Sequence, residues 1–354
     1  MTVDINLDLK HLKGDLKKKI QKIEADKKIG FATKKSKVGD FKSFVYDVPI
    51  NVKGPIIAPK RLFDKAIIDE VTPAMNELIK EGVVVQATDN IVIVSNLLPV
   101  SKPTSNYVLK SKIDKSLQLN SSVSMNRSRI TVDIRECNKY INTAPPLPLP
   151  KISQIKSKMK NMLFSILDLS MMFYSIRLTK RSQSFLCFHS LRDDSIWQFT
   201  RLVMGLKTAP FVATRALQMV LNEKNFVTFV ETIEDKNLRE TFRQLKLENL
   251  LICYIDDLLL ASPKSLGVEV HLKLFEFVME MMCQYGFKLN KSKFNILCDT
   301  VTFLGIELNS QGCNGIPPER RNLLATVRTP RSLAELFCRI CQFSYSSNYI
   351  LHFS

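Results

Sequence analysis

The sequence predicts an α+β fold in which an antiparallel sheet carries a cluster of acidic residues. Segments of helical period alternate with short apolar runs that are typical of strands joined as hairpins. In the stretch 251–262 (LICYIDDLLLAS), two apolar runs flank Asp256 and Asp257 and predict two buried strands with a tight turn between them. Asp168 lies near the end of another apolar run, 164–169 (FSILDL). We expect these strands to lie side by side.

Three carboxylates at one place indicate a metal site. Like charges held together are costly unless cations lie between them, and carboxylate oxygens are ligands that Mg²⁺ prefers. Asp256 and Asp257 alone could equally be turn residues at a solvated hairpin tip. The second strand, which delivers Asp168, favours the metal site.

The N-terminal half predicts the following elements in order. Residues 1–50 predict a helix around Leu16 and Ile20 and a strand at 41–48, both outside the main body. A helix is expected to start at Thr72, with Pro73 in its first turn, and to end at Gly82.

Further segments follow before the Asp168 strand. They are strands at 83–85 and 91–94, a polar mobile loop at 102–126, a strand at 129–135, an extended proline-rich connector at 145–150 and a short helix at 153–160.

The C-terminal half contains the predicted acidic hairpin. The chain breaks at Gly205 and restarts as a helix that reaches Val220. Residues 222–248 are charged and predict a loop with an amphipathic turn. After the hairpin, a helix at 271–285 is capped by Gly286, and 301–308 predicts another strand. From Pro317 onward the pattern predicts two helical segments.

Composition indicates a globular protein with a polyanionic partner. The 354 residues are 45% hydrophobic, and 51 Lys and Arg against 34 Asp and Glu give a formal charge of +17. Basic residues spread along the whole chain can make many phosphate contacts, although charge alone also fits an ordinary basic protein. No apolar run approaches the ~20 residues of a membrane span, and the N-terminus lacks a secretion signal. We therefore expect no membrane association and a cytoplasmic location, within virus-like particles or in the nucleus as further possibilities.

The eight cysteines predict reduced core residues, because they are scattered through apolar contexts. Cys338 and Cys341 form a lone C-x-x-C with no second pair and no nearby His. Zinc requires four ligands, so this pair is not a predicted zinc site.

Five motifs together resemble the reverse transcriptase family, closest to its Ty3/Gypsy and retroviral group. They are 165–169 (SILDL), 201–210 (RLVMGLKTAP), 254–257 (YIDD), 286–290 (GFKLN) and 303–307 (FLGIE), in the order and approximate spacing of that family. The resemblance implies a right-hand polymerase with fingers, a palm built as a ferredoxin-like antiparallel sheet with helices, and a partial thumb.

The resemblance also implies a domain layout. It predicts an N-terminal extension at 1–50, fingers at 51–142 and 176–204, a palm at 143–175 and 205–308, and a partial thumb at 309–354. The region before Asp256 is longer than in retroviral relatives, and 337–342 (FCRICQ) differs from the usual thumb sequence. The protease, RNase H and integrase domains of a full-length polyprotein are absent here, which suggests an excised domain, a truncated reading frame or a remnant.

Catalysis would depend on Asp168, Asp256 and Asp257 as ligands of two Mg²⁺ ions, with Mn²⁺ as a substitute. Two ions about 4 Å apart would clamp the attacking primer 3′-oxygen and the leaving pyrophosphate. Phe173 would exclude a ribose 2′-hydroxyl, and Lys293 resembles a residue proposed to protonate pyrophosphate, although a surface lysine would look the same.

Nucleotide and primer contacts are implied at further positions. Arg129 would grip the triphosphate together with Lys102, for which Arg127 is an alternative. Met204 and Gly205 would border the incoming nucleotide, Gly205 by allowing close backbone approach. The residues Phe303, Leu304 and Gly305 would form a primer grip.

The expected partners are an RNA template, a DNA primer or template, and dNTPs. One alternative enzyme is an RNA-dependent RNA polymerase, against which Phe173 argues. An alternative of another class is a catalytically impaired or domesticated retroelement fragment that binds nucleic acid through its charge. Retention of all three aspartates argues against decay of the site.

Overall fold

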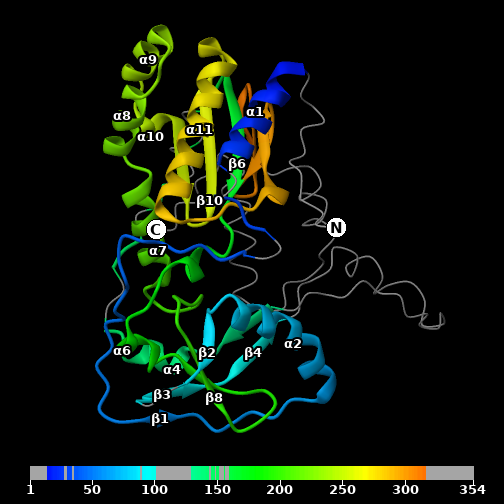
Figure 1. Ribbon diagram of the computed structural model, residues 1–354, viewed down its shortest axis with the longest axis vertical. Coiled ribbons are helices and arrows are strands. Elements are labelled where there is room, and N and C mark those ends of the chain that lie inside the picture. Colours follow the sequence, from blue (N-terminus) through cyan, green and yellow to red (C-terminus); the bar gives the residue numbers. More distant parts are fainter. Residues whose placement is uncertain are drawn as a thin grey trace, which may run out of the picture. The chain divides into compact units, whose positions relative to one another are not determined.

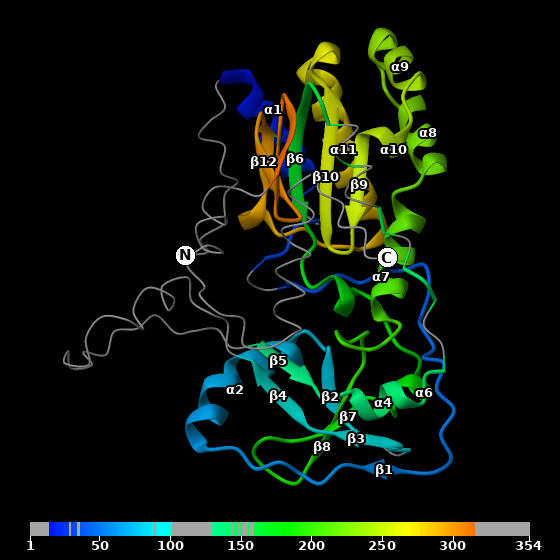
Figure 2. The same ribbon diagram turned by 180° about the vertical axis from the view of Figure 1, so that it is seen from behind.

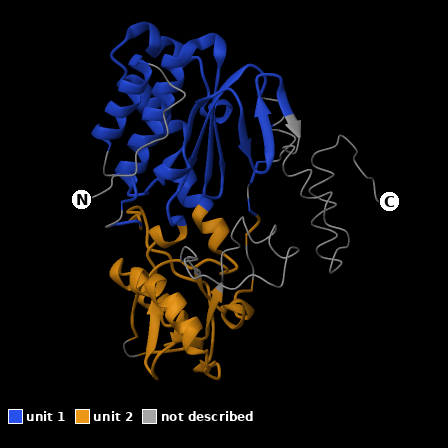
Figure 3. Cartoon of the chain, turned by 90° about the vertical axis from the view of Figure 1, so that its right-hand side faces the viewer, with its two compact units in different colours: residues 1–37, 147–172, 214–354 blue, residues 38–146, 173–213 orange. Residues whose placement is uncertain are grey.

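The computed structural model describes residues 14–27, 30–33, 36–87, 90–100, 129–142, 145–147, 149–150, 155 and 159–315. Lys102, Arg127, the C-x-x-C pair and the predicted segments 102–126 and beyond Pro317 lie outside these residues, as does most of the predicted helix 153–160. The chain divides into two compact units, coloured in Figure 3. Unit 1 comprises residues 1–37, 147–172 and 214–354, and unit 2 comprises 38–146 and 173–213.

Unit 1 is built on a four-stranded antiparallel sheet of order β11-β6-β10-β9. Its strands are β6 (Met162–Asp168), β9 (Leu251–Tyr254), β10 (Asp257–Pro263) and β11 (Asn295–Cys298). The predicted antiparallel sheet that carries the acids is therefore confirmed.

A second, three-stranded sheet of unit 1 packs on one face of the first. It consists of β12 (Val301–Phe303), β13 (Ile306–Asn309) and β14 (Gly312–Gly315). Phe164, Ile166 and Leu259 share a buried cluster with Val301 and Phe303. The prediction of one strand at 301–308 was wrong, because the chain turns back at Leu304 and Gly305.

Helices cover the other face of the four-stranded sheet (Figures 1 and 2). The helices and 3-10 turns of unit 1 are α1 (Gly14–Asp26), α8 (Glu223–Glu231), α9 (Lys236–Arg243), α10 (Leu247–Leu250), η3 (Lys264–Leu266), α11 (Gly267–Tyr285) and η4 (Lys291–Lys293). The predicted Gly286 cap of α11 is confirmed, since Gly286 adopts a left-handed φ of 82°.

A buried histidine ties α11 to the sheet. The His271 Nε2 atom lies 2.7 Å from Ser165 Oγ on β6, and its Nδ1 atom lies 2.8 Å from Ser262 Oγ on β10. Ser165 Oγ also accepts a hydrogen bond from the Leu297 backbone N–H at 3.0 Å. Burial lowers the pKa of His271 to about 4. The imidazole is therefore neutral near pH 7 and joins three elements of the unit.

The region 222–248 is helical, so its prediction as a loop was wrong. Asn222 and Asp235 cap α8 and α9 through their side chains. Phe226 and Phe229 of α8 place their rings 5.4 and 5.3 Å from the ring of Phe277 on α11. Burial of these aromatic rings outweighs the local charge that made the segment look like a loop.

Unit 2 contains a five-stranded sheet of order β1-β3-β7-β8-β2 and a two-stranded sheet of β4 and β5. Its strands are β1 (Ile56–Ile57), β2 (Val84–Gln86), β3 (Ile93–Ser95), β4 (Leu97–Val100), β5 (Arg129–Val132), β7 (Cys187–His189) and β8 (Ile196–Phe199). Its helices are α2 (Lys65–Lys80), α4 (Arg135–Lys139) and α6 (Lys180–Gln183). The elements η2 (Met172–Ser175) and α7 (Ala209–Val220) include residues of both units.

The helix α2 differs from its prediction at the N-terminal end. It starts at Lys65, so Pro73 lies inside the helix and not in its first turn. Burial of Val71 and partial burial of residues before it extend the apolar stripe backwards. The predicted end at Gly82 is confirmed by its φ of 67°. Among the described residues, no helix combines the length and apolarity that a membrane crossing requires.

The described cysteines are all unpaired, as predicted. Cys137 and Cys187 are buried, and burial raises the pKa of each thiol to about 12. These thiols are protonated core groups with little nucleophilic character. The assignment of the two units to fingers, palm and thumb stays a prediction.

Candidate active site

A two-residue hairpin loop holds Asp256 between β9 and β10. Tyr254 pairs with Asp257, so Ile255 and Asp256 alone form the loop. Ile255 has a φ of 55°, a conformation that a β-branched residue rarely adopts. Such a residue costs roughly 1–3 kcal/mol and persists where the surrounding structure enforces it. Here the paired strands on both sides enforce it.

Asp168 meets this hairpin through strand pairing. In the register of β6 and β10, Asp168 is the direct partner of Asp257. The Leu169 backbone N–H also donates to the Asp256 carbonyl oxygen at 3.0 Å. Directly paired residues have Cα atoms about 4.5–5.5 Å apart and side chains on the same face. The structure therefore brings the three predicted aspartates together at one end of the sheet.

Lys293 is the cation next to these acids. Its Nζ lies 2.7 Å from Asp168 Oδ1, while the Asn290 N–H donates to the Asp168 carbonyl oxygen at 2.8 Å. The Asp168 side chain is 10% exposed and the Lys293 side chain 58%, so the lysine reaches a buried carboxylate from the solvent side. The turn η4 thus positions Lys293 at the site.

The carboxylates of the cluster repel one another, which disfavours the ionised form of Asp257. Burial raises the pKa of Asp257, and the neighbouring Asp256 and Asp168 raise it further, whereas Lys293 opposes them. A carboxyl group that resists ionisation for these reasons gains from a nearby cation.

Donor type and charge fit divalent cations. Carboxylate oxygens are hard ligands, and the three aspartates supply them at a single sheet end. As the side chains lie, no set of three His, Cys, Asp or Glu residues in the described ranges is arranged as a ready metal site. Asp168 instead satisfies one oxygen with Lys293. Binding a cation at all three carboxylates would therefore require side-chain rearrangement, including release of Asp168 from Lys293.

The predicted primer-grip residues form the turn between β12 and β13. Phe303 pairs with Ile306, which leaves Leu304 and Gly305 as a two-residue loop with φ values of 51° and 81°. These values match a type I′ hairpin turn. Phe303 is 2% exposed and packs with Ile166. Since alternate residues of a strand share a face, Ile166 lies on the same face of β6 as Asp168.

Three predicted nucleotide-site residues lie in unit 2. Phe173 is partly buried in η2, Met204 is 42% exposed, and Gly205 has a φ of 88°. A Cβ on Gly205 would lie 3.4 Å from the Ile134 Cδ1 atom. The backbone therefore favours glycine at this position.

Sequence reasoning missed Asn138, which holds the turn around Gly205. Its Nδ2 donates to the Gly205 carbonyl oxygen at 2.9 Å, and its Oδ1 accepts from the Lys207 N–H at 2.7 Å. The only available signal was an Asn at the end of a short polar helix, which is common in proteins.

An arginine just beyond β5 is paired with an acid. Arg129 begins β5, and its role as a triphosphate ligand stays a prediction. Arg135 donates to both carboxylate oxygens of Asp133 at 2.8 and 2.6 Å, which lowers the pKa of Asp133.

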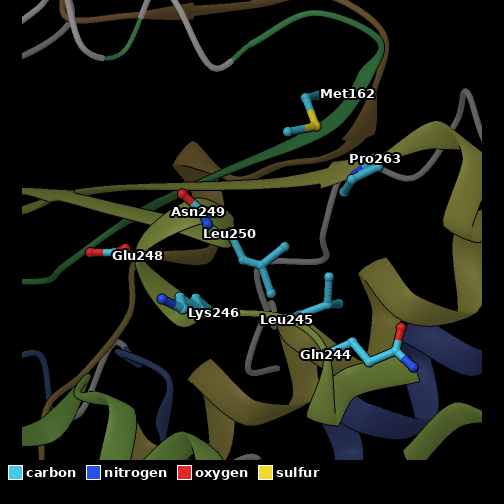
Figure 4. A pocket seen from close by; sticks show the side chains of 8 residues that line it. All are labelled: Met162, Gln244, Leu245, Lys246, Glu248, Asn249, Leu250 and Pro263. Carbon is cyan, nitrogen blue, oxygen red and sulfur yellow. The ribbon is translucent and has the colours of Figure 1, made fainter. Parts of the chain in front are cut away.

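A pocket of about 450 Å³ lies away from the acids (Figure 4). It is lined by Met162, Gln244, Leu245, Lys246, Glu248, Asn249, Leu250 and Pro263. Met162 and Pro263 pair at the opposite ends of β6 and β10 from Asp168 and Asp257. This pocket is therefore separate from the candidate active site.

An antiparallel sheet with paired acids at one end and helices on one face is the arrangement predicted above for an α+β polymerase fold. The profile of the family "Reverse transcriptase (RNA-dependent DNA polymerase)" matches residues 109–308, and the chain belongs to this family. Its members generally use divalent metal ions.

Relatives and solved structures agree with this assignment. The "Enzymatic polyprotein" of Cestrum yellow leaf curling virus is 31% identical over 52% of this chain and 25% of its own length. The "Retrovirus-related Pol polyprotein from transposon opus" of Drosophila melanogaster is 22% identical over 86% of this chain and 26% of its own length.

A foamy viral protease-reverse transcriptase, solved with an RNA/DNA hybrid, has the same fold. Its TM-score is 0.70 at 19% identity, and the match covers 98% of this chain and 41% of that chain. The predicted α+β polymerase fold and the resemblance to the family are confirmed.

Proposed function

We propose that this chain is an RNA-directed DNA polymerase that extends a DNA primer on an RNA or DNA template with dNTPs. The observation that carries the proposal is the direct pairing of Asp168 with Asp257, one residue from Asp256. This register supports the proposal, because metal-assisted nucleotidyl transfer requires neighbouring carboxylates that can share two cations. The foamy viral relative solved with an RNA/DNA hybrid supports nucleic acid as the partner.

The aspartates and their neighbours would have different tasks in the proposed reaction. Asp168, Asp256 and Asp257 would hold two Mg²⁺ ions, for which Mn²⁺ can substitute. When bound, these ions supply charge stabilisation to the attacking 3′-oxygen and to the leaving pyrophosphate. Lys293 lies next to Asp168 and can give a proton to a phosphate oxygen. Ile255 fixes the direction of the loop that carries Asp256.

Other parts of the chain would bind the substrates. The net charge of +17 favours phosphate contacts that do not depend on sequence, as a copying enzyme requires. Arg129, Lys102 and Gly205 would border the incoming nucleotide, and Phe173 would select deoxyribose. The turn of Phe303, Leu304 and Gly305 would support the primer end.

We also propose that the chain is the polymerase segment of a longer Pol polyprotein of the Ty3/Gypsy type. It spans about a quarter of the relatives named above, which are themselves polyproteins. Protease, RNase H and integrase activities would then reside in other segments, and the enzyme would act in the cytoplasm or in particles.

Primer extension with an Asp256→Asn variant and a matched control tests the activity. The control is Asp299→Asn, because Asp299 is 75% exposed and pairs with Lys264 away from the cluster. With Mg²⁺ on RNA and DNA templates, the wild type and Asp299→Asn should extend, and Asp256→Asn should not. All three should bind template alike, since one charge in +17 changes phosphate attraction little.

Two results would count against the proposal. A wild-type chain that binds nucleic acid without extending primers in either metal would indicate a binding protein. Full activity of Asp256→Asn would show that the aspartate cluster is not the reaction centre.

A further inference from the structure

The N-terminal segment is built into unit 1, contrary to the prediction that it lies outside the main body. Ile20 of α1 is fully buried. Lys19 forms an ion pair with Glu269, and Lys27, just after α1, forms one with Glu280 at 3.3 Å, so this segment contacts α11 near its start and in its C-terminal half. Figure 1 shows α1 lying beside α11 over the four-stranded sheet.

The chain after α1 forms a strap, which we define as residues 30–33 together with 36–37. The strap forms hydrogen bonds with both the N–H and the carbonyl oxygen of Leu289. The Leu289 N–H donates to the Gly30 carbonyl oxygen at 2.8 Å, and the Ala32 N–H donates to the Leu289 carbonyl oxygen at 2.9 Å. Phe31 and Leu289 therefore form a parallel bridge.

The same short segment 288–290 contacts the end of β6. Leu289 forms an antiparallel bridge with Leu169. The Asn290 N–H donates to the Asp168 carbonyl oxygen at 2.8 Å, and the Ser170 N–H donates to the Lys288 carbonyl oxygen at 2.7 Å. Segment 288–290 thus lies between the strap and the backbone that carries Asp168.

A second tie links the strap to this region directly. The Ser170 Oγ donates to the Lys37 carbonyl oxygen at 2.9 Å, and the Lys288 Nζ donates to the Ser36 carbonyl oxygen at 3.2 Å. One set of backbone contacts and one set of side-chain contacts therefore hold Asp168 and the two residues that follow it.

We propose that the strap is a positioning element for the aspartate cluster. The strap holds Asp168 in the strand register that pairs it with Asp257, and it keeps Asn290 and Lys293 next to Asp168. Loss of the strap contacts weakens cation binding without removing any cation ligand. This inference rests on the proposed function for its catalytic meaning, but the binding effect is measurable by itself.

Gly30 is the position at which the strap can be perturbed cleanly. A Cβ there would lie 2.6 Å from the Cys283 Sγ on α11, closer than real Cβ atoms approach. The next nearest atoms of Cys283 are the backbone N and Cα at 3.7 and 3.8 Å, which is ordinary contact. Gly30→Ala therefore collides with the sulfur alone, and Cys283→Ala removes the collision.

The experiment uses the full chain and four variants: Gly30→Ala, Cys283→Ala, the double variant, and Lys19→Ala as a surface control. Lys19 and Glu269 are both more than half exposed, so Lys19→Ala leaves the strap in place. The readouts are Mn²⁺ binding to the free protein by electron paramagnetic resonance, the melting temperature, and primer extension against metal concentration.

Gly30→Ala should weaken Mn²⁺ binding by about 10- to 100-fold, the range for residues that orient metal ligands. Cys283→Ala and Lys19→Ala should bind Mn²⁺ like the wild type, and the double variant should recover most of the lost affinity. Nucleic-acid binding should change little. Recovery in the double variant distinguishes positioning from general damage by the added methyl group.

The inference is overturned if Gly30→Ala lowers the melting temperature while its Mn²⁺ affinity stays at the wild-type value, or if Cys283→Ala fails to rescue it. Should Gly30→Ala not fold, Ser170→Ala replaces it, because it removes only the hydroxyl tie to Lys37. Wild-type Mn²⁺ affinity in Ser170→Ala then overturns the inference. Failure of wild-type extension, with Mn²⁺ affinities that follow the variants as expected, refutes the proposed function and leaves the strap intact.

Discussion

Replacing His271 with glutamine should make the protein less sensitive to mild acid. His271 is fully buried between Ser165 and Ser262, and burial lowers its pKa from 6.5 to about 4. As the pH falls below about 6.5, His271 is therefore protonated in the unfolded chain but stays neutral in the folded chain. The contribution of His271 to the free energy of unfolding is therefore fully present above pH 6.5 and is lost as the pH falls from 6.5 toward 4.

The size of the effect follows from the pKa difference. One pKa unit corresponds to about 1.4 kcal/mol, so the full loss at pH 4 is roughly 3 kcal/mol, and about 2 kcal/mol is already lost at pH 5. Glutamine cannot take up the proton, yet it offers one donor and one acceptor group to the two serines. Its own cost is present at both pH values and cancels in the comparison.

Urea unfolding of the wild type and His271→Gln at pH 7 and pH 5 measures this difference. The carboxylates titrate in both proteins alike, so the wild type should lose about 2 kcal/mol more than the variant between the two pH values. Equal losses within about 0.5 kcal/mol would refute the reasoning, because the histidine would then be protonated in the folded state or reached by water.

Three other outcomes are expected. Gly205→Ala should lower stability by about 1–2 kcal/mol in urea unfolding, since a φ of 88° is unfavourable for a residue with a side chain; an unchanged midpoint would mean that the turn relaxes. Phe173→Val should raise ribonucleotide incorporation relative to dNTPs by an amount on the order of 1–3 kcal/mol in selectivity; a fixed ratio with a lower melting temperature would make Phe173 a core residue. Nucleic-acid affinity should fall steeply with salt and differ little among templates, as filter binding can show; salt-independent or sequence-restricted binding would favour a specific regulatory module.

The acidic hairpin could be predicted because its signal is local. Two apolar runs that flank Asp256 and Asp257 fix both strands and the turn within twelve residues of sequence. The position of the Asp168 strand beside the hairpin was expected from the shared pattern, whereas the pairing of Asp168 with Asp257 followed only from the structure. Register depends on which face of each strand is buried against the rest of the protein.

Elements that depend on tertiary packing were predicted less well. The helices α8 and α9 carry many charges, and Phe226 and Phe229 of α8 are buried against Phe277, which lies far along the chain. The helical spacing of α1 could be read from the sequence, but its position against α11 could not. One buried residue, Ile20, among exposed lysines does not indicate which element the helix packs against. The turn at Leu304 was also missed, because leucine in an apolar run gives no sign of a left-handed backbone conformation.

The unfavourable backbone of Ile255 has a consequence for how the site comes into being. Without the paired strands around it, isoleucine would avoid a φ of 55°. The pairing of β9 with β10, and of β10 with β6 from a distant stretch of the chain, makes that conformation the best available. The loop that carries Asp256 should therefore reach its final shape only once this sheet has formed, so a growing chain that already contains Asp256 and Asp257 would not yet hold them as the folded protein does.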